Sequence, residues 1–200
     1  MAVTSNVVSS RLRISGKTKS PVGREGWLKV ARAALIREGI AGVKIGTLAR
    51  RLNLTRGGFY WFFVSREELL DDLLDDWERT NSDAIRSILA GSRHDGMAEL
   101  HAVVDMMLTE DRYSPAWDAA MRDWGRRSTK VANAVRRVDA ERIAVFKQIF
   151  INMGCTDDEA LVRARISYLH QVGYDTLGIR EPREERLRLL PLYIQYLTGR

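Results

Sequence analysis

Residues 55–61 read Thr-Arg-Gly-Gly-Phe-Tyr-Trp. Of all segments in the chain, this one has the side chains best suited to binding a partner. Thr55 offers a hydroxyl, Arg56 a guanidinium, and Gly57 and Gly58 offer bare backbone at the start of a short predicted helix. The helix dipole is positive at that end, so the segment favours an anionic partner. Guanidinium and hydroxyl groups also bind base edges in DNA. The segment therefore predicts recognition of nucleic acid.

Other reactive side chains do not form a pattern typical of an enzyme. The sequence has no Ser-His-Asp arrangement, no glycine-rich phosphate loop and no cluster with metal-ligand spacing. His101 and Asp105 stand one helical turn apart and could be polar anchors in a pocket, metal ligands together with His94, or a local hydrogen-bonded pair. The single cysteine, Cys155, excludes a disulfide framework. We expect a protein that is not an enzyme, without catalytic residues, metal or cofactor.

The segment 55–61 needs a scaffold, and the apolar residues predict one that is entirely α-helical. From Gly23 onward, apolar side chains recur at spacings of three and four, and no stretch alternates as a strand would. Glycine at position 39 is expected to end the first helix. We expect about nine helices, which span Gly23 to Gly39, 45–52, 54–63, Ser65 to about Leu89, His94 to Glu110, Pro115 through Trp124, Ser128 to about Met153, Thr156 to about Leu177, and Pro182 to Leu197.

Local start signals support several of these boundaries. Ser65 with Glu68 and Thr156 with Glu159 have the spacing of a capping box, in which the first side chain binds a backbone amide three residues on. Proline at position 115 follows a serine and suits the first position of a helix.

Positive charge is concentrated at the beginning of the chain. Residues 1–66 hold 13 Lys and Arg against two acidic residues, a net charge of +11, whereas residues 67–200 have a net charge of −5. This asymmetry indicates a polyanionic partner for the first part only. No apolar run approaches the ~18 residues of a membrane helix, and the N-terminus lacks the apolar block of a secretory signal. These features predict a soluble, cytoplasmic protein.

Residues 24–74 resemble the DNA-binding domain of the TetR family of bacterial transcriptional regulators. The likeness rests on Ala33-Ala34-Leu35 to Gly39-Ile40, on the helix-turn-helix residues 43–63, and on Ser65-Arg66-Glu67-Glu68-Leu69-Leu70, all at intact spacing. The resemblance implies a DNA-binding domain at 21–80, with its motif at about 43–62, and an effector-binding and dimerisation domain at 81–200. Residues 1–20 would be a flexible basic arm that reaches the minor groove or remains a solvated tail.

The resemblance also implies which residues contact DNA. Arg56 is the first choice for a guanine, because a bidentate arginine–guanine pair gives ~1–3 kcal/mol of discrimination. Trp61 faces the bases, with packing against the first helix as the alternative. Tyr60 and Arg66 match phosphate contacts on either side of the recognition helix. The expected DNA-binding residues are Lys44, Thr47, Thr55, Arg56, Gly57, Tyr60, Trp61 and Arg66.

Four departures from the family pattern concern the motif and the residues beside it, and one of them, Arg66 in place of a lysine, keeps the charge. Lys44 stands where the family usually has a capping threonine, and a lysine cannot cap but can meet a phosphate. Gly58 replaces a threonine or serine, and Phe62 replaces a histidine. These changes affect base specificity rather than DNA binding itself.

The last two predicted helices correspond in order to the dimerisation helices of the family. Each has an apolar stripe that could form a dimer interface or, equally, the core of the chain itself. The candidate interface residues are Leu161, Arg165, Leu169, Val172, Leu190 and Ile194.

Large and adaptable side chains in the middle helices predict an effector pocket. Trp117, Met121 and Trp124 recur at i, i+4 and i+7 on one face, although such a stripe is also typical of ordinary core. The candidate ligand-binding residues are His101, Met107, Trp117, Met121, Trp124 and Phe146.

The sequence thus predicts a DNA-binding transcriptional regulator. We expect a repressor that binds a palindromic double-stranded operator as a homodimer and is released by an unidentified small molecule. The alternatives are a small all-α enzyme and an architectural DNA binder without ligand control.

Overall fold

The computed structural model describes residues 22–91, 94–109, 113–179 and 181–199, so the predicted basic arm at 1–20 lies outside the described residues. Within these ranges the chain contains nine α-helices, one 3₁₀ helix and no strand, which confirms the predicted all-α fold. The elements are α1 (Arg24–Glu38), η1 (Ile40–Gly42), α2 (Ile45–Arg51), α3 (Arg56–Phe59), α4 (Arg66–Ala90), α5 (Gly96–Thr109), α6 (Pro115–Gly125), α7 (Thr129–Asn152), α8 (Asp157–Leu177) and α9 (Arg183–Thr198).

Two helices differ from their predicted lengths. The third was predicted at 54–63, but α3 has four residues, since two glycines favour helix poorly and the chain then tightens into turns. The helix predicted from His94 begins at Gly96, because His94 has a left-handed φ of 60°. The carboxylate of Asp95 instead accepts hydrogen bonds from the amides of Met97 and Ala98, both at 3.1 Å, as an N-cap does.

Of the two predicted capping boxes, the structure contains one. The Ser65 hydroxyl accepts a hydrogen bond from the Glu68 amide at 3.2 Å, and the Glu68 carboxylate accepts from the Val64 amide at 2.6 Å. Thr156 occupies the N-cap position of α8 but makes no capping hydrogen bond, and Glu159 is paired with Arg163 instead. The prediction of a helix start at Thr156 is therefore confirmed, whereas the predicted capping hydrogen bond was wrong.

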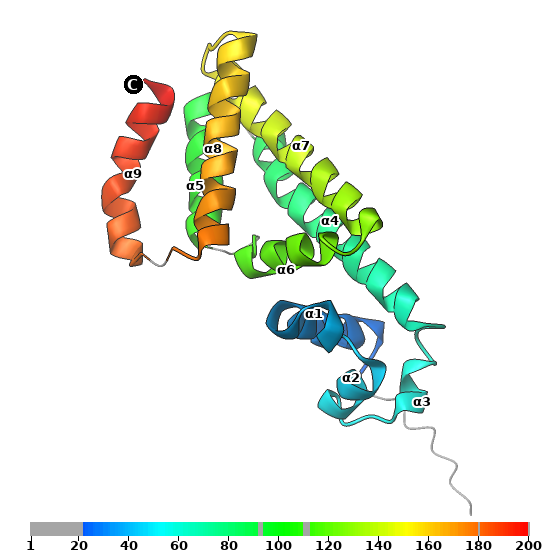
Figure 1. Ribbon diagram of the computed structural model, residues 1–200. Helices are drawn as coiled ribbons and strands as arrows, with labels where there is room; N and C mark the ends of the chain where they lie inside the picture. Colours follow the sequence, from blue (N-terminus) through cyan, green and yellow to red (C-terminus); the bar gives the residue numbers. More distant parts are fainter. Residues whose placement is uncertain (1–21, 92–93, 110–112, 180, 200) are drawn as a thin grey trace, which may run out of the picture.

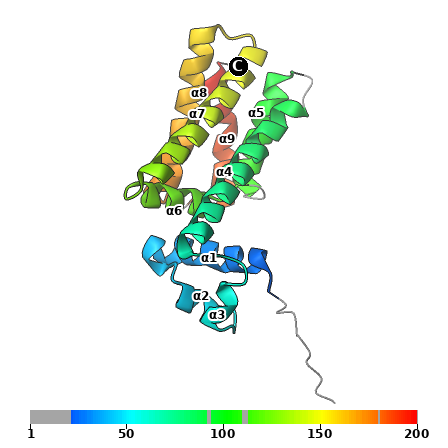
Figure 2. The ribbon, with the colours of Figure 1, turned by 90° about the vertical axis from the view of Figure 1, so that its right-hand side faces the viewer.

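The helices form two packed groups joined by α4 (Figures 1 and 2). α1, α2 and α3 cluster at one end, and α5, α7, α8 and α9 lie at the other, while α6 lies across the junction beside α1. One hydrophobic core gathers α1–α4, α6 and the first half of α7 around Trp27, Trp77 and Trp117. The second core gathers the end of α4 with α5, α7 and α8. α9 contributes only Thr198 to the buried residues.

Candidate DNA-binding surface and effector cavity

The turn between α2 and α3 is made by a residue in the left-handed conformation. Asn53 has a φ of 54°, and its amide donates to the Arg50 carbonyl at 3.1 Å. The Leu54 amide donates to the Ala49 carbonyl at 2.9 Å. This pair of bonds is a Schellman motif, which satisfies the last carbonyls of α2 and reverses the chain. The predicted tight turn at Asn53-Leu54 is present, and it sets α3 at an angle to α2.

The inner side of α3 is fixed by one aromatic residue. Phe59 is fully buried and meets the Trp27 ring edge-on, with 5.3 Å between centroids. Its other face stacks on Phe63 at 5.1 Å. Aromatic pairs of this geometry contribute about 0.5–1.5 kcal/mol beyond their buried area. Because Phe59 is held in this way, the rest of α3 is turned toward solvent.

The predicted base-facing residues lie together on that outer side. Thr55, Arg56 and Gly57 are exposed at the start of α3, and the Thr55 side chain makes no capping bond. Trp61 is 84% exposed, so the alternative of packing against the first helix is wrong. Tyr60 is 52% exposed and rests edge-on against Phe59. The outer side therefore presents two hydroxyls, from Thr55 and Tyr60, one guanidinium and two aromatic rings.

The beginning of α2 carries two of the three remaining predicted contacts. Lys44 is exposed at the N-cap position and makes no capping bond, as expected for a lysine there. Thr47, in the first turn of α2, is half-buried. Both lie at the same end of α2, and their contact with DNA stays a prediction.

Arg66 has a different role from the predicted phosphate contact. Its guanidinium is half-buried and donates to the carbonyls of Val43 at 2.6 Å and Ile40 at 3.0 Å. The Ile40 carbonyl belongs to η1, and the Val43 carbonyl belongs to the link between η1 and α2. Arg66 thus holds η1 and the segment before Lys44 against the start of α4.

Arg24 makes a second clamp on the same domain. Its guanidinium pairs with Glu68 at 2.8 Å and Asp72 at 2.7 Å, and it lies 4.2 Å above the Phe63 ring. The Val64 amide and Arg24 together lower the pKa of the Glu68 carboxyl. The start of α1 is thereby tied to α4, on the side away from α3's exposed face.

The face of α6 that was predicted to line an effector pocket is core instead. Trp117, Met121 and Trp124 are all buried in the first core, where α6 packs against α1. The Arg32 guanidinium of α1 lies 3.5 Å above the Trp117 ring. The ligand-binding prediction for these three residues was wrong, because their apolar face is covered by α1 and α7 rather than by a cavity.

A cavity of about 110 Å³ lies between α5, α7, α8 and α9. Met107 and Phe146 are among the residues that line it, and their role as ligand-binding residues stays a prediction. His101 does not, since its exposed ring binds the Met97 carbonyl at 2.8 Å, and that prediction was wrong. The wall is completed by Leu100, Val103, Val104, Leu108, Ser167, His170, Gln171, Tyr174, Glu181, Arg186, Leu190, Tyr193, Ile194 and Leu197.

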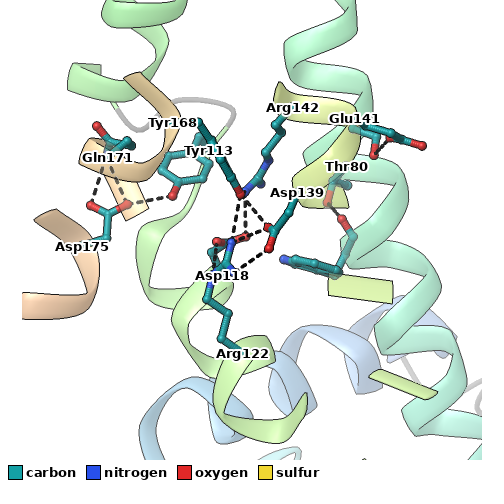
Figure 3. Close-up of polar contacts among 12 residues, drawn as sticks. Thr80, Tyr113, Asp118, Arg122, Asp139, Glu141, Arg142, Tyr168, Gln171 and Asp175 are labelled. Carbon is teal, nitrogen blue, oxygen red and sulfur yellow. Dashed lines mark hydrogen bonds and ion pairs between the residues drawn. The ribbon is translucent and has the colours of Figure 1, made fainter. Parts of the chain in front are cut away.

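A buried polar network lies between this cavity and α6 (Figure 3). On α6, Asp118 pairs with Arg142 at 3.1 Å, and Arg122 pairs with Asp139 at 2.6 Å. Tyr168 of α8 donates to Asp139 at 2.6 Å and accepts from Arg122 at 3.0 Å. Burial raises the pKa of Tyr168 to about 12, so its hydroxyl remains a donor at neutral pH.

The network continues from α8 toward the cavity. Tyr113 is buried and donates to Asp175 at 2.8 Å. The same carboxylate accepts from Gln171, which is a cavity residue. The Arg142 guanidinium, which pairs with Asp118, lies 5.4 Å from the centre of the Tyr113 ring. The path from the cavity wall to α6 therefore consists of hydrogen bonds, one cation–π contact and one ion pair.

The predicted dimer residues divide into three groups. Arg165 and Leu169 are exposed on α8, as an interface requires, and Leu161 is half-buried. Val172 packs against the second core, and Leu190 and Ile194 line the cavity, which favours for these three the alternative of a role inside the chain. The exposed apolar side chains of the two helices are Val162, Ile166, Leu169, Leu177, Leu187, Leu192, Tyr193 and Tyr196.

Sequence reasoning missed the polar residues of the cavity and the network. Arg142 gave a signal that could have been used, because it falls on the apolar stripe of α7 between Val138 and Val145. A charged residue at a core position implies a buried partner. His170, Gln171, Tyr174 and Arg186 gave no such signal, since polar residues are common on exposed helix faces.

Two further findings concern the described part of the chain. No helix in it is long and apolar enough to cross a membrane. No group of three or more His, Cys, Asp or Glu side chains in the same residues could hold a metal ion.

Comparison with known proteins gives one family and a set of similar folds. Residues 28–73 match the model of the bacterial regulatory proteins, tetR family. No curated protein matches the chain. Among solved structures, a putative TetR-family transcriptional regulator from Mesorhizobium loti is 16% identical, with a TM-score of 0.62 over 92% of this chain and 98% of that chain.

Two other structures have the same fold. A TetR transcriptional regulator from Legionella pneumophila is 16% identical, with a TM-score of 0.62 over 94% of this chain and 96% of its own. The reduced form of Escherichia coli NemR is 15% identical, with a TM-score of 0.61 over 88% and 92%. At such low identity these structures share the fold of this chain.

Proposed function

The helix-turn-helix domain of this chain belongs to the TetR family of bacterial regulatory proteins, and from that premise we propose a ligand-released repressor. In this proposal a homodimer binds a palindromic operator, and a small molecule in the cavity lowers its affinity for DNA. The observation that carries the proposal is the outer side of α3, where Thr55, Arg56 and Trp61 are exposed beside a positively charged domain.

DNA recognition is supported by the shape of α3 as well as by its charge. Gly57 and Gly58 place no side chains on the helix, so its backbone can approach a duplex closely. Arg56 is then the one basic side chain on α3, and it makes no ion pair with any described residue. We propose that Arg56 reads a guanine, that Trp61 contacts thymine methyl groups, and that Lys44, Thr47 and Tyr60 bind phosphates.

The proposal is tested by selecting genomic DNA fragments with the purified protein and sequencing them. A palindrome is expected, because a two-fold dimer requires a two-fold operator. Arg56→Ala should then lower affinity for the selected operator about 10- to 100-fold and relax preference at one base pair per half-site, which corresponds to ~1–3 kcal/mol. Fragments without a common sequence would exclude a specific regulator and favour the architectural alternative.

A homodimer is supported by the exposed apolar side chains of α8 and α9. Val162, Ile166 and Leu169 lie at i, i+4 and i+7 of α8, on one face, and Tyr193 and Tyr196 are exposed on the neighbouring α9. The two helices lie side by side (Figure 1), so these residues can form one apolar patch. A second copy with the same patch would cover it.

Sedimentation of the purified protein tests this part. We expect twice the chain mass of 22.8 kDa. Leu169→Glu should give monomers, because an unpaired charge in an apolar interface costs several kcal/mol. Val64→Glu is the control, since Val64 is also an exposed apolar residue, at 84% against 61% for Leu169, but lies just before α4 and away from α8. A monomeric wild-type protein would contradict the dimer.

Ligand control is supported by the route from the cavity to α3. The polar network connects Gln171 in the cavity wall to Asp118 and Arg122 on α6. The neighbouring Trp117 and Trp124 pack on α1, and Trp27 of α1 holds Phe59 of α3. A ligand that shifts α8 would thereby change the position of α1 and the spacing of the two recognition helices in the dimer, a population shift away from the DNA-binding state.

A further inference from the structure

We propose that the cavity between α5, α8 and α9 binds an amphipathic organic carboxylate, with Arg186 as the anchor of its anionic group. The inference rests on the proposed function, because it names the class of the releasing ligand. It starts from the residues that line the cavity and from which of their polar atoms are already bonded within the chain.

Most of the cavity wall is apolar. Val104, Met107 and Leu108 of α5 face Leu190 and Ile194 of α9 across the space. The volume of about 110 Å³ is somewhat below that of an engineered apolar cavity of about 150 Å³ that binds benzene. The apolar part of a ligand would therefore have about five or six carbon atoms before any helix has to move.

Three polar wall residues are already satisfied by the chain. The Ser167 hydroxyl donates to the Arg163 carbonyl at 2.9 Å, and the Gln171 amide donates to Asp175 at 3.1 Å. The Tyr174 hydroxyl donates to the Glu181 carboxylate at 3.1 Å, which also supplies that carboxylate with a donor. Each of these groups therefore has a hydrogen-bond partner without a ligand.

Arg186 is different. Its guanidinium lies 4.9 Å from the centre of the Tyr174 ring, and among the residues that the structure describes it has neither an ion pair nor a hydrogen bond. It is half-buried in the first turns of α9, where the helix dipole adds positive potential. A carboxylate matches two guanidinium donors at once. The cavity thus offers mainly apolar walls, the Glu181 carboxylate, which already accepts a hydrogen bond from Tyr174, and one cation, Arg186, without a partner.

The test compares three probes of equal length that differ only in the head group: hexanoate, 1-hexanol and hexylamine. Binding to the full-length protein is measured by calorimetry. Hexanoate should bind at least tenfold more tightly than hexanol, and hexylamine should bind most weakly. Arg186→Gln should remove the advantage of hexanoate over hexanol and leave hexanol binding within twofold of its original value.

Arg188→Gln is the matched control, because Arg188 lies two residues away on the same helix but is exposed and paired with Glu185 at 3.3 Å. It should change neither affinity. Equal binding of hexanoate and hexanol to the wild type, preference for hexylamine, an equal loss in both variants, or no binding of any probe would overturn the proposal.

Operator binding in the presence of each probe separates this inference from the proposed function. If hexanoate binds through Arg186 but leaves operator affinity unchanged, the carboxylate site stands and ligand release fails. If other molecules release the operator and hexanoate does not bind, ligand release stands and the carboxylate site fails.

Discussion

The two hydrophobic cores of this protein differ in how completely they are filled. The first, between the DNA-binding helices, α6 and α7, closes around three buried tryptophans. The second leaves a cavity of about 110 Å³ beside it, and the adjoining helices α8 and α9 expose apolar side chains such as Tyr196, at 86%. Closely packed interiors transmit displacement, whereas loosely covered faces can accept a ligand or a partner. The difference indicates that the helices around the first core are rigid, whereas α8 and α9 can adapt to a ligand or a partner.

The largest effect should come from opening the first core. Trp117→Ala should lower the free energy of unfolding by ~3–5 kcal/mol, as deletion of a buried tryptophan does. Met107→Ala is the comparison in the second region, where the side chain already borders empty space. Its cost should stay below about 2 kcal/mol, because little new cavity is created.

Urea unfolding at one fixed protein concentration measures both variants. Similar losses for Trp117→Ala and Met107→Ala would mean that the two regions are equally well packed. If Trp117→Ala is as stable as the wild type and binds ligand more weakly, α6 lines the effector pocket, as its sequence predicted.

The outcome for α6 shows what periodicity can and cannot predict. The spacing of Trp117, Met121 and Trp124 correctly indicated one apolar face, and the helix boundaries followed from Pro115 and the residues after Gly125. Periodicity does not say which neighbour covers a face, since α1 and a ligand are both apolar partners. The same limit applies to Leu190 and Ile194, which were placed on an outer interface and instead line the cavity.

The positions of the predicted DNA-binding residues were easier to anticipate, because their arrangement is local. The turn at Asn53, the burial of Phe59 and the exposure of Arg56 follow from spacing within one short motif. Arg66 was the exception, because its partners, the carbonyls of Val43 and Ile40, depend on how α4 packs against η1. Contacts between elements that are distant in the chain are the part that the sequence left open.

A smaller effect is expected where the two regions meet. Tyr168→Phe removes a hydroxyl that donates to Asp139 and accepts from Arg122, and it should cost about 1–3 kcal/mol of stability. It should also reduce the factor by which a cavity ligand lowers operator affinity, because it cuts the link from α8 to α6. By linkage, the same reduction should appear in the effect of operator DNA on ligand binding.

Titrations of operator with and without ligand measure this coupling. Tyr196→Phe is the control, since Tyr196 is exposed and no hydrogen bond among the described residues joins it to the network. If Tyr168→Phe loses stability but keeps the full effect of the ligand on DNA binding, the network holds the fold together without carrying the signal.

The smallest effect compares two helix starts, one in each region. The Ser65 hydroxyl caps α4 through the Glu68 amide, so Ser65→Ala should cost ~1 kcal/mol. Thr156 holds the equivalent position on α8 without a capping bond, so Thr156→Ala should cost only a few tenths of a kcal/mol, roughly the scale of an ordinary surface change. Both substitutions remove a hydroxyl from an N-cap, and their difference therefore isolates the bond itself. Urea unfolding under identical conditions should separate the two variants by more than the error of the method. Equal losses would mean that Thr156 caps α8 in solution, and that the beginning of α8 is as firmly held as the beginning of α4.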